Sequence, residues 1–226
     1  MELTVTCIIP AWNEAARLPG VLAAVVGHPW VDRVLVVDDG STDGTTAVAQ
    51  ANGAQVLTLA ANGGKSAAVA AGLRQVKSDI VLLVDADLQG FGEKHVTQLL
   101  KPLRDGVADA SISLRSNAPW PWRLVGLDYI SGERAMFTAR LQPHLASVAK
   151  LRGFGLEVFL NHLWLCAGHR IAVVPLSGVA SPSKGAKRGR AKGIVDDLIM
   201  ICDIFRTVGI GRVIGQIVRL RMAGVR

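Results

Sequence analysis

The chain contains few cysteines and few aromatic residues. Its three cysteines, Cys7, Cys166 and Cys202, lie far apart and among apolar neighbours. An odd number at such spacings matches neither a disulfide framework nor a zinc site, so we expect reduced thiols in a cytoplasmic protein. Aromatic residues make up 5% of the chain, which disfavours nucleic acid as a partner because single-stranded binding depends on base stacking.

Long hydrophobic runs are also missing, although half of the residues are hydrophobic. No run approaches the roughly 20 apolar residues that cross a bilayer. No signal peptide is evident, because Met1-Glu2-Leu3 leads directly into a strand-like run. The formal charge of +7 predicts an anionic partner, such as a nucleotide sugar, a lipid phosphate or the inner face of the cytoplasmic membrane.

Apolar, strand-like segments alternate with helix-like segments in the first half of the chain. The strand-like segments span residues 3–9, 34–37, 56–59 and 80–84. Such alternation predicts an α/β fold with a mainly parallel sheet flanked by helices, in which ligands bind at the carboxyl ends of the strands. In the less regular second half we expect a loop at 117–122 and a strand at 171–176. We expect one domain over residues 1–193 and a helical extension over 194–226.

The fourth strand-like segment leads into Asp85-Ala86-Asp87-Leu88-Gln89. Because side chains alternate along a strand, the two carboxylates are expected to point the same way. They would repel each other unless a cation lies between them. Hard divalent ions such as Mg²⁺ or Mn²⁺ take oxygen ligands and keep open positions for substrate phosphates. This segment therefore predicts a metal site for a phosphate-bearing ligand.

Three other polar clusters follow strand-like segments. Pro10-Ala11-Trp12-Asn13-Glu14 ends the first strand, and Asn13 is placed to cap a following helix. Asp38-Asp39-Gly40-Ser41 follows the second strand and is equally good turn chemistry. Asn62-Gly63-Gly64-Lys65 opens a helix; Lys65 fits either a phosphate contact or a solvated surface lysine. The spacing of a P-loop is absent from this last cluster.

These four motifs, in this order, resemble the family-2 inverting glycosyltransferases of the GT-A fold. Within that family the chain is most similar to the polyprenyl-phosphate (dolichyl-phosphate) mannosyl- or glucosyltransferases. The resemblance is detailed over residues 3–92 and looser to about residue 195. It implies metal-dependent transfer of a sugar from a UDP- or GDP-linked donor to an acceptor, preferably a polyprenyl phosphate.

The resemblance also implies roles for individual residues. Asp39 is expected to accept a hydrogen bond from a ring N–H of uracil or guanine. The expected metal ligands are Asp85, Asp87 and Gln89. The nucleotide pocket is expected to contain Pro10, Ala11, Asn13, Glu14, Asp38, Asp39, Lys65, Asp85 and Ala86.

Catalytic and acceptor residues are expected mainly in the second half of the chain. The expected catalytic residues are Asp87, Glu157, Arg115 and Arg134, and the expected acceptor contacts are Ser131, Gly132, Lys187 and Arg188. Glu157 fits a general base and a helix cap equally well. Lys187 and Arg188 belong to a basic, glycine-bearing loop, which is either a lid over the substrates or a solvated loop.

The C-terminal segment, 203–226, has the pattern of a basic amphipathic helix. Three arginines, Arg212, Arg219 and Arg226, are seven residues apart, and we place them on one side together with Gln216. The apolar side is expected to hold Ile210, Val213, Ile214, Ile217 and Leu220. Such a helix can lie on an anionic membrane, pack on its own domain or pair in a homodimer.

Other functions remain open at the level of sequence. The same chemistry on a soluble acceptor, such as phosphoglycerate or a saccharide, needs no membrane contact. A sugar-1-phosphate nucleotidyltransferase would have a glycine-rich N-terminal loop, which is not present here. A non-catalytic module that binds nucleotide sugars would not need the acidic pair Asp85 and Asp87.

Overall fold

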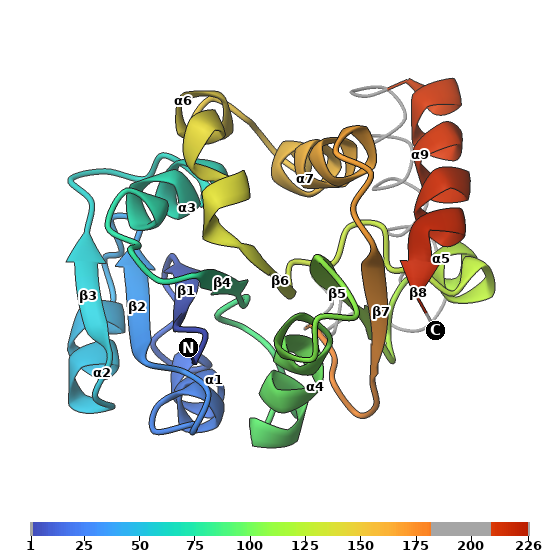
Figure 1. Cartoon of the computed structure of the whole chain (residues 1–226). Helices are drawn as coiled ribbons and strands as arrows, with labels where there is room; N and C mark the ends of the chain where they lie inside the picture. The colour runs from blue at the N-terminus through green and yellow to red at the C-terminus, as the bar shows by residue number, and fades with distance from the viewer. Residues whose placement is uncertain (1, 182–208, 226) are drawn as a thin grey trace.

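The computed structural model describes residues 2–181 and 209–225. These residues form one eight-stranded sheet in the order β3-β2-β1-β4-β6-β5-β7-β8 (Figure 1). Neighbouring strands are parallel except where β6 pairs with β4 and β5. The strands are β1 (Val5–Ala11), β2 (Arg33–Asp38), β3 (Gln55–Thr58), β4 (Ile80–Leu83), β5 (Ala110–Arg115), β6 (Arg134–Phe137), β7 (Ile171–Leu176) and β8 (Gly224–Val225). The mainly parallel α/β fold expected from the sequence is confirmed.

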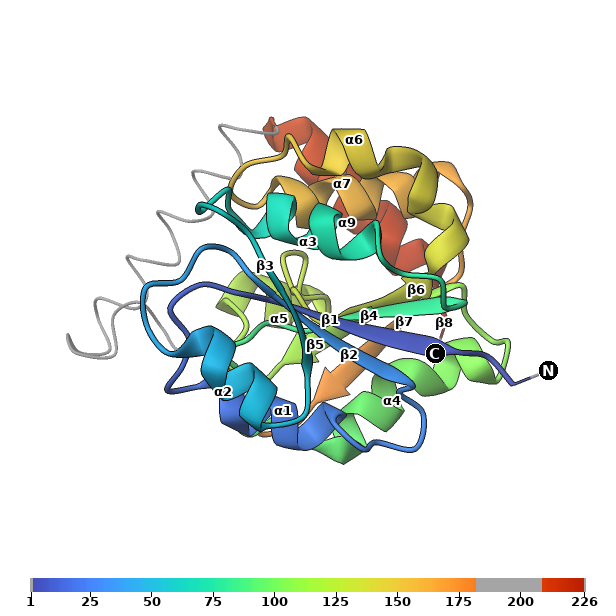
Figure 2. The same cartoon turned by 90° about the vertical axis from the view of Figure 1, so that its left-hand side faces the viewer.

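Helices cover both faces of the sheet (Figure 2). One face carries α1 (Leu18–Val25), α2 (Thr45–Ala51) and α4 (Glu93–Arg104); the other carries α3 (Lys65–Leu73), α6 (Leu145–Val148), α7 (Gly155–Cys166) and α9 (Ile210–Ala223). Helix α5 (Trp120–Val125) follows β5 (Figure 1). Two short 3₁₀ segments, Thr138–Arg140 and Gln142–His144, lead from β6 into α6. None of the helices in the described ranges is long and apolar enough to cross a membrane.

The central strands are apolar because both of their faces are buried. In β1, Ile8 joins the hydrophobic cluster under α3 and α7, whereas Cys7 and Ile9 join the cluster under α1 and α4. β4 divides in the same way, with Val81 on one side and Leu82 on the other. A strand buried on both faces needs a continuous apolar run. The polar segment that follows this run therefore lies at the carboxyl end of the strand.

Three local expectations were wrong. Asn13 does not cap α1, which begins at Leu18; its backbone is left-handed, with φ 55°, and its side chain accepts a 2.8 Å hydrogen bond from the Thr42 N–H. The segment expected as a loop at 117–122 contains the start of α5. The chain does not stay helical to its end, because β8 adds to the sheet beside β7. For Asn13 and β8, a contact distant in sequence decides the local structure.

Helix α9 packs on its own domain, against α7. Among its described side chains, Val213, Gln216 and Leu220 are buried, so Gln216 belongs to the packed side of the helix. Spacings of three and four residues put these three positions on one side of the helix. Tyr129 donates a 2.7 Å hydrogen bond to Gln216 Oε1 within this interface. The expected domain boundary at residue 193 lies outside the described residues.

The hydrogen bond between Tyr129 and Gln216 predicts a measurable coupling. Tyr129→Phe leaves the buried amide oxygen of Gln216 without its donor and is expected to lower the free energy of unfolding by about 1–3 kcal/mol. Replacing both partners, as Tyr129→Phe with Gln216→Leu, removes the polar pair and is expected to lower it by less than the sum of the single changes. Urea denaturation measures all three variants; additive losses would contradict the coupling.

Candidate active site

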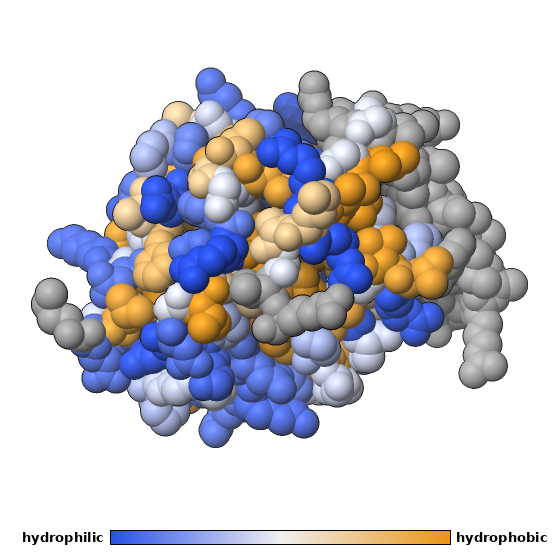
Figure 3. Space-filling model, turned by 45° about the vertical axis from the view of Figure 1, so that its right-hand side comes forward, coloured by the Kyte–Doolittle hydropathy of each residue, from blue (hydrophilic) through white to orange (hydrophobic). Residues whose placement is uncertain are grey.

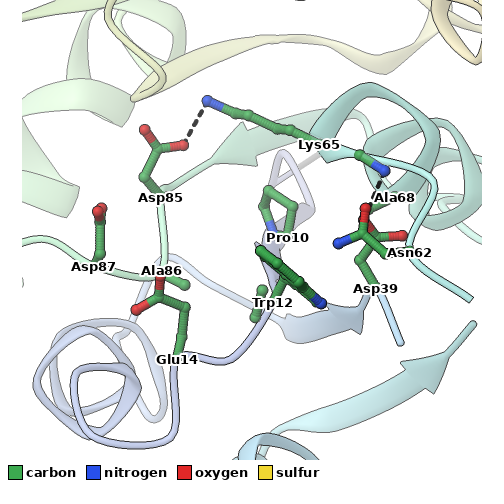
Figure 4. A pocket seen from close by; sticks show the side chains of 12 residues that line it. Pro10, Trp12, Glu14, Asp39, Asn62, Lys65, Ala68, Asp85, Ala86 and Asp87 are labelled. Atoms are coloured by element: carbon green, nitrogen blue, oxygen red, sulfur yellow. Dashed lines mark hydrogen bonds and ion pairs between the residues drawn. The ribbon is translucent and has the colours of Figure 1, made fainter. Parts of the chain in front are cut away.

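A cavity of about 400 Å³ opens at the carboxyl ends of β1, β2 and β4 (Figure 4). Most of the residues expected in the nucleotide pocket line it, together with Trp12, Asn62, Gly64 and Ala68. The complete lining is Pro10, Ala11, Trp12, Glu14, Asp39, Asn62, Gly64, Lys65, Ala68, Asp85, Ala86 and Asp87. Trp12 and Asn62 were missed as site residues, although each lies within a motif that the sequence already identifies.

Lys65 connects three segments at the inner side of the cavity. Its Nζ lies 2.6 Å from Asp85 Oδ1, just after β4, and 2.9 Å from Glu157 Oε1, in the first turn of α7. Burial opposes the charge of Lys65, but attraction by Asp85 and Glu157 outweighs burial and raises the pKa of Lys65 above its ordinary value. Lys65 is therefore a structural cation of the site, and the interpretation as a solvated surface lysine was wrong.

Asp85 and Asp87 differ although they are two residues apart. Burial alone would raise the pKa of Asp85, but the neighbouring Lys65 ammonium holds it below its ordinary range. The pKa of Asp87 is raised to about 6, first by burial and then by the charges of Asp85 and Glu14. Both carboxyl groups extend to the same side of the segment in Figure 4, but β4 ends at Leu83 and a turn holds the second acid.

The acidic residues present fit a divalent cation that shares its ligands with a substrate. Across residues 2–181 and 209–225 there is no cluster of three or more His, Cys, Asp or Glu side chains that would enclose an ion. Mg²⁺ and related ions are commonly held by one or two carboxylates and complete their coordination with phosphates and water. Burial and then its acidic neighbours raise the pKa of Asp87. A cation beside it would therefore stabilise its ionised form.

Gln89 lies outside this group. Its side chain is exposed and does not line the cavity, and its backbone pairs with Ala180 through hydrogen bonds of 2.8 and 3.0 Å. The expected role of Gln89 as a metal ligand is therefore not supported by its position. The two-residue bridge instead ties the segment after β4 to the segment after β7.

The motif residues divide into those that line the cavity and those that support it. Asp39 lines it and also accepts hydrogen bonds from the Gly63 and Gly64 N–H groups, at 2.9 and 2.7 Å. Asp38 is buried and accepts from the Ser41 N–H at 2.8 Å and from the Thr46 hydroxyl. Asp38 and Asn13 thus shape the turn beneath the pocket rather than face a ligand.

Arg115 and Arg134 are both internal in this structure. Arg115 pairs with Asp128 at 2.8 Å and borders a second, smaller cavity of about 220 Å³. Arg134 is completely buried; it donates to Asn161 Oδ1 at 2.7 Å and to the Ser131 carbonyl at 2.7 Å, and burial lowers its pKa to about 10. Through these contacts Arg134 connects β6 to α7, whereas the sequence led us to expect a catalytic role.

The expected acceptor residues take different positions. Ser131 is buried and hydrogen-bonded to Ser113 and Glu133, so it supports β6 instead of facing a ligand. Gly132 lies directly against the Asp85 carboxyl group, and a Cβ there would overlap it. Glu157 is buried and its Oε1 is held by Lys65, so it does not line the cavity as a free base. Lys187 and Arg188 lie outside the described residues.

The contacts of Lys65 predict a large and specific loss of stability on its removal. Lys65→Met leaves Asp85 and Glu157 without their shared cation. Because Glu157 is buried but Lys65 and Asp85 are partly exposed, this is expected to lower the free energy of unfolding by about 1–3 kcal/mol. Lys101→Met is the matched control, because Lys101 pairs with the exposed Asp105; it is expected to lose less than about 1 kcal/mol. Equal losses in the two variants, measured by urea denaturation, would contradict the account.

The raised pKa of Asp87 predicts that this residue destabilises the metal-free protein. Above pH 6 the folded state must keep a carboxylate whose pKa is about 6 against an ordinary 3.8. Asp87→Asn removes this penalty and is expected to stabilise the protein by about 1–2 kcal/mol near pH 7, after allowance for solvent screening. Below pH 4 the carboxyl is protonated in both states, so the gain should vanish. Denaturation in a chelator across this range tests it; a pH-independent difference would contradict it.

Comparison with known proteins identifies the family. Residues 6–156 match the family described as glycosyl transferase family 2. An uncharacterised glycosyltransferase of Mycobacterium tuberculosis (strain H37Rv) is 30% identical over 213 residues, which cover 85% of this chain and 95% of the relative. An undecaprenyl-phosphate 4-deoxy-4-formamido-L-arabinose transferase of Serratia proteamaculans is 33% identical over 130 residues, 52% of this chain and 39% of that protein.

Solved structures agree with this assignment. Glucosyl-3-phosphoglycerate synthase of Mycobacterium tuberculosis, crystallised with Mn²⁺, UDP and glucosyl-3-phosphoglycerate, superposes with a TM-score of 0.70 at 25% identity, covering 92% of this chain and 81% of that one. The same enzyme with phosphoglyceric acid gives a TM-score of 0.71. The family match over more than half of the chain, the relative covered almost end to end and the shared sheet lead to one assignment: this protein is a glycosyltransferase, a member of glycosyl transferase family 2 with the GT-A fold.

Proposed function

We propose that the protein transfers a sugar from a UDP-sugar to a phosphate-bearing acceptor, with Mg²⁺ or Mn²⁺ as its cofactor. The observation that carries this proposal is the cavity in which Asp39 and Trp12 lie at one end and Asp85 and Asp87 at the other. Such a cavity offers a hydrogen-bond acceptor and an aromatic surface to a base, and carboxylates to a cation that binds a diphosphate.

The choice of UDP rests on two supports. The mycobacterial synthase was crystallised with UDP and with Mn²⁺ or Mg²⁺ in the complexes described for it. In this chain, Asp39 is fixed by two backbone N–H groups and retains further lone pairs toward the cavity. Uracil has a ring N–H that can donate a hydrogen bond to such a carboxylate.

Asp87 is proposed as the principal protein ligand of the cation, with Asp85 beside it. A cation bound there supplies charge neutralisation to the diphosphate, which makes UDP a better leaving group. Asp85 is held in place by Lys65 and by close packing against Gly132. Because these contacts exist without a substrate, the carboxylate needs little reorganisation when the donor binds.

The ion pair of Glu157 with Lys65 supports a phosphate acceptor. A hydroxyl acceptor needs a general base, and Glu157, the base candidate, is buried and its Oε1 is already occupied. A phosphate group is ionised near neutral pH and attacks without one. The resemblance to inverting enzymes further suggests attack from the face opposite the leaving group, with inversion at the anomeric carbon.

The names of two relatives point to two different phosphate-bearing acceptors. The Serratia relative acts, by its name, on undecaprenyl phosphate, and the mycobacterial synthase binds phosphoglyceric acid. The two acceptors share a phosphate group and differ in the apolar chain. An assay with a short polyprenyl phosphate in one arm and phosphoglycerate in the other, followed by NMR of the product's anomeric proton, distinguishes them and reads the stereochemistry.

Turnover is expected to depend on Asp87. Asp87→Ala should lower the Mn²⁺-dependent release of UDP from a UDP-sugar by about 100-fold or more, because the charge that develops on the leaving group is no longer stabilised. Asp109→Asn is the matched control. Asp109 pairs with Arg170 at 3.3 Å beside the amino end of β5, away from the carboxyl ends that border the cavity. If Asp87→Ala still released UDP at the wild-type, Mn²⁺-dependent rate, Asp87 would not be the proposed metal ligand.

A further inference from the structure

Helix α9 has a second apolar stripe that faces outward. Ile214, Val218 and Met222 are 52%, 53% and 81% exposed and recur every four residues, so they share one side of the helix. We call these three residues the outer stripe. Figure 3, which brings the α9 side of the molecule forward, shows hydrophobic surface between hydrophilic side chains there.

The fold does not require the outer stripe to be apolar. The opposite side of α9, with Val213, Gln216 and Leu220, already buries the helix against the domain. An outward helix face of a surface helix normally carries charged or polar residues. Contiguous exposed apolar side chains instead mark a surface that binds a partner or a membrane.

Helix α5 carries a further exposed apolar side chain. Leu124 of α5 is 81% exposed. Gly126, two residues later, lies against the Arg221 side chain of α9, since a Cβ built there would be 3.0 Å from Arg221 Nη1. The Arg221 side chain therefore reaches from α9 to the end of α5.

The charged residues of α5 and α9 are all arginines. Arg219 and Arg221 are exposed and flank the outer stripe on α9, and Arg123 precedes Leu124 on α5. Neither helix contains an Asp or a Glu. An apolar stripe bordered by arginines, on a protein of net charge +7, is the pattern of a helix that lies in an anionic membrane interface.

A second copy of the chain fits this surface less well. In a two-fold symmetric pair the same patch meets itself, so the arginines of α9 would face those of the other copy. Neither α5 nor α9 offers an acid to compensate them. Like charges brought together across an interface oppose association, whereas anionic phospholipid headgroups neutralise the arginines.

We propose that the face formed by α5 and the outer stripe of α9 docks on an anionic phospholipid bilayer. This face shares Ile214 with the apolar side expected from the sequence, but Val213 and Leu220 of that side stay packed on the domain. The proposal does not depend on the donor or the acceptor of the transfer reaction.

Vesicle co-sedimentation tests this proposal. The wild-type protein is expected to bind phosphatidylcholine vesicles that contain phosphatidylglycerol, more weakly at high salt, and to bind pure phosphatidylcholine poorly. Val218→Gln with Met222→Gln is expected to weaken binding by about tenfold or more, because apolar area no longer enters the interface. Arg219→Gln with Arg221→Gln should also weaken it and reduce its dependence on salt.

Matched controls separate docking from unfolding and from catalysis. Val107→Gln replaces an apolar residue that is 50% exposed outside this face, and it should bind vesicles like the wild type. The α9 variants should keep the wild-type unfolding midpoint and the wild-type rate of UDP release without vesicles. Absence of wild-type binding to anionic vesicles, or equal binding by the Val218/Met222 variant, would overturn the proposal. So would a wild-type dimer that these substitutions dissociate without any vesicle binding.

Discussion

The ion pairs of Lys65 are the constraint on which the site depends. One ammonium group joins the start of α3, the segment after β4 and the first turn of α7. Because Asp85 and Glu157 are both acidic and largely removed from water, neither is stable in its position without this cation. The contact holds the Asp85 carboxylate in its position beside the cavity. It also connects the regular first half of the domain to the less regular second half, where α7 begins.

The site separates two carboxylates that the sequence presents as a pair. The charge of ionised Asp85 is balanced by Lys65, whereas the ionised form of Asp87 is disfavoured by burial and by neighbouring acids. In the proposed function, a cation that binds with the diphosphate would stabilise the ionised form of Asp87 and would find Asp85 already held by Lys65. The two acids are therefore proposed to contribute differently to one metal position. This division explains how the described part of the chain can offer a metal position without an enclosing cluster of ligands.

The sequence was sufficient to predict strands and cavity-lining segments where the local apolar pattern agrees with the burial in the structure. Continuous apolar runs in β1 and β4 predict strands buried on both faces, and the polar segments that follow them do line the cavity. It was insufficient where a distant partner decides the conformation. Nothing near Asn13 indicates that its side chain holds the loop at Thr42, and nothing near Arg134 indicates that Asn161 and the Ser131 carbonyl enclose it. Gln216 faces inward for the same reason: its partner, Tyr129, is 87 residues away.

Calorimetric titration of UDP into the wild-type protein, with and without Mn²⁺, tests the central claim most directly. If Asp87 and Asp85 hold a cation that the diphosphate shares, Mn²⁺ should tighten UDP binding by about tenfold or more, and Asp87→Asn should abolish that gain while leaving the weak metal-free binding unchanged. UDP binding of equal strength with and without the ion, or no binding in either condition, would contradict the account.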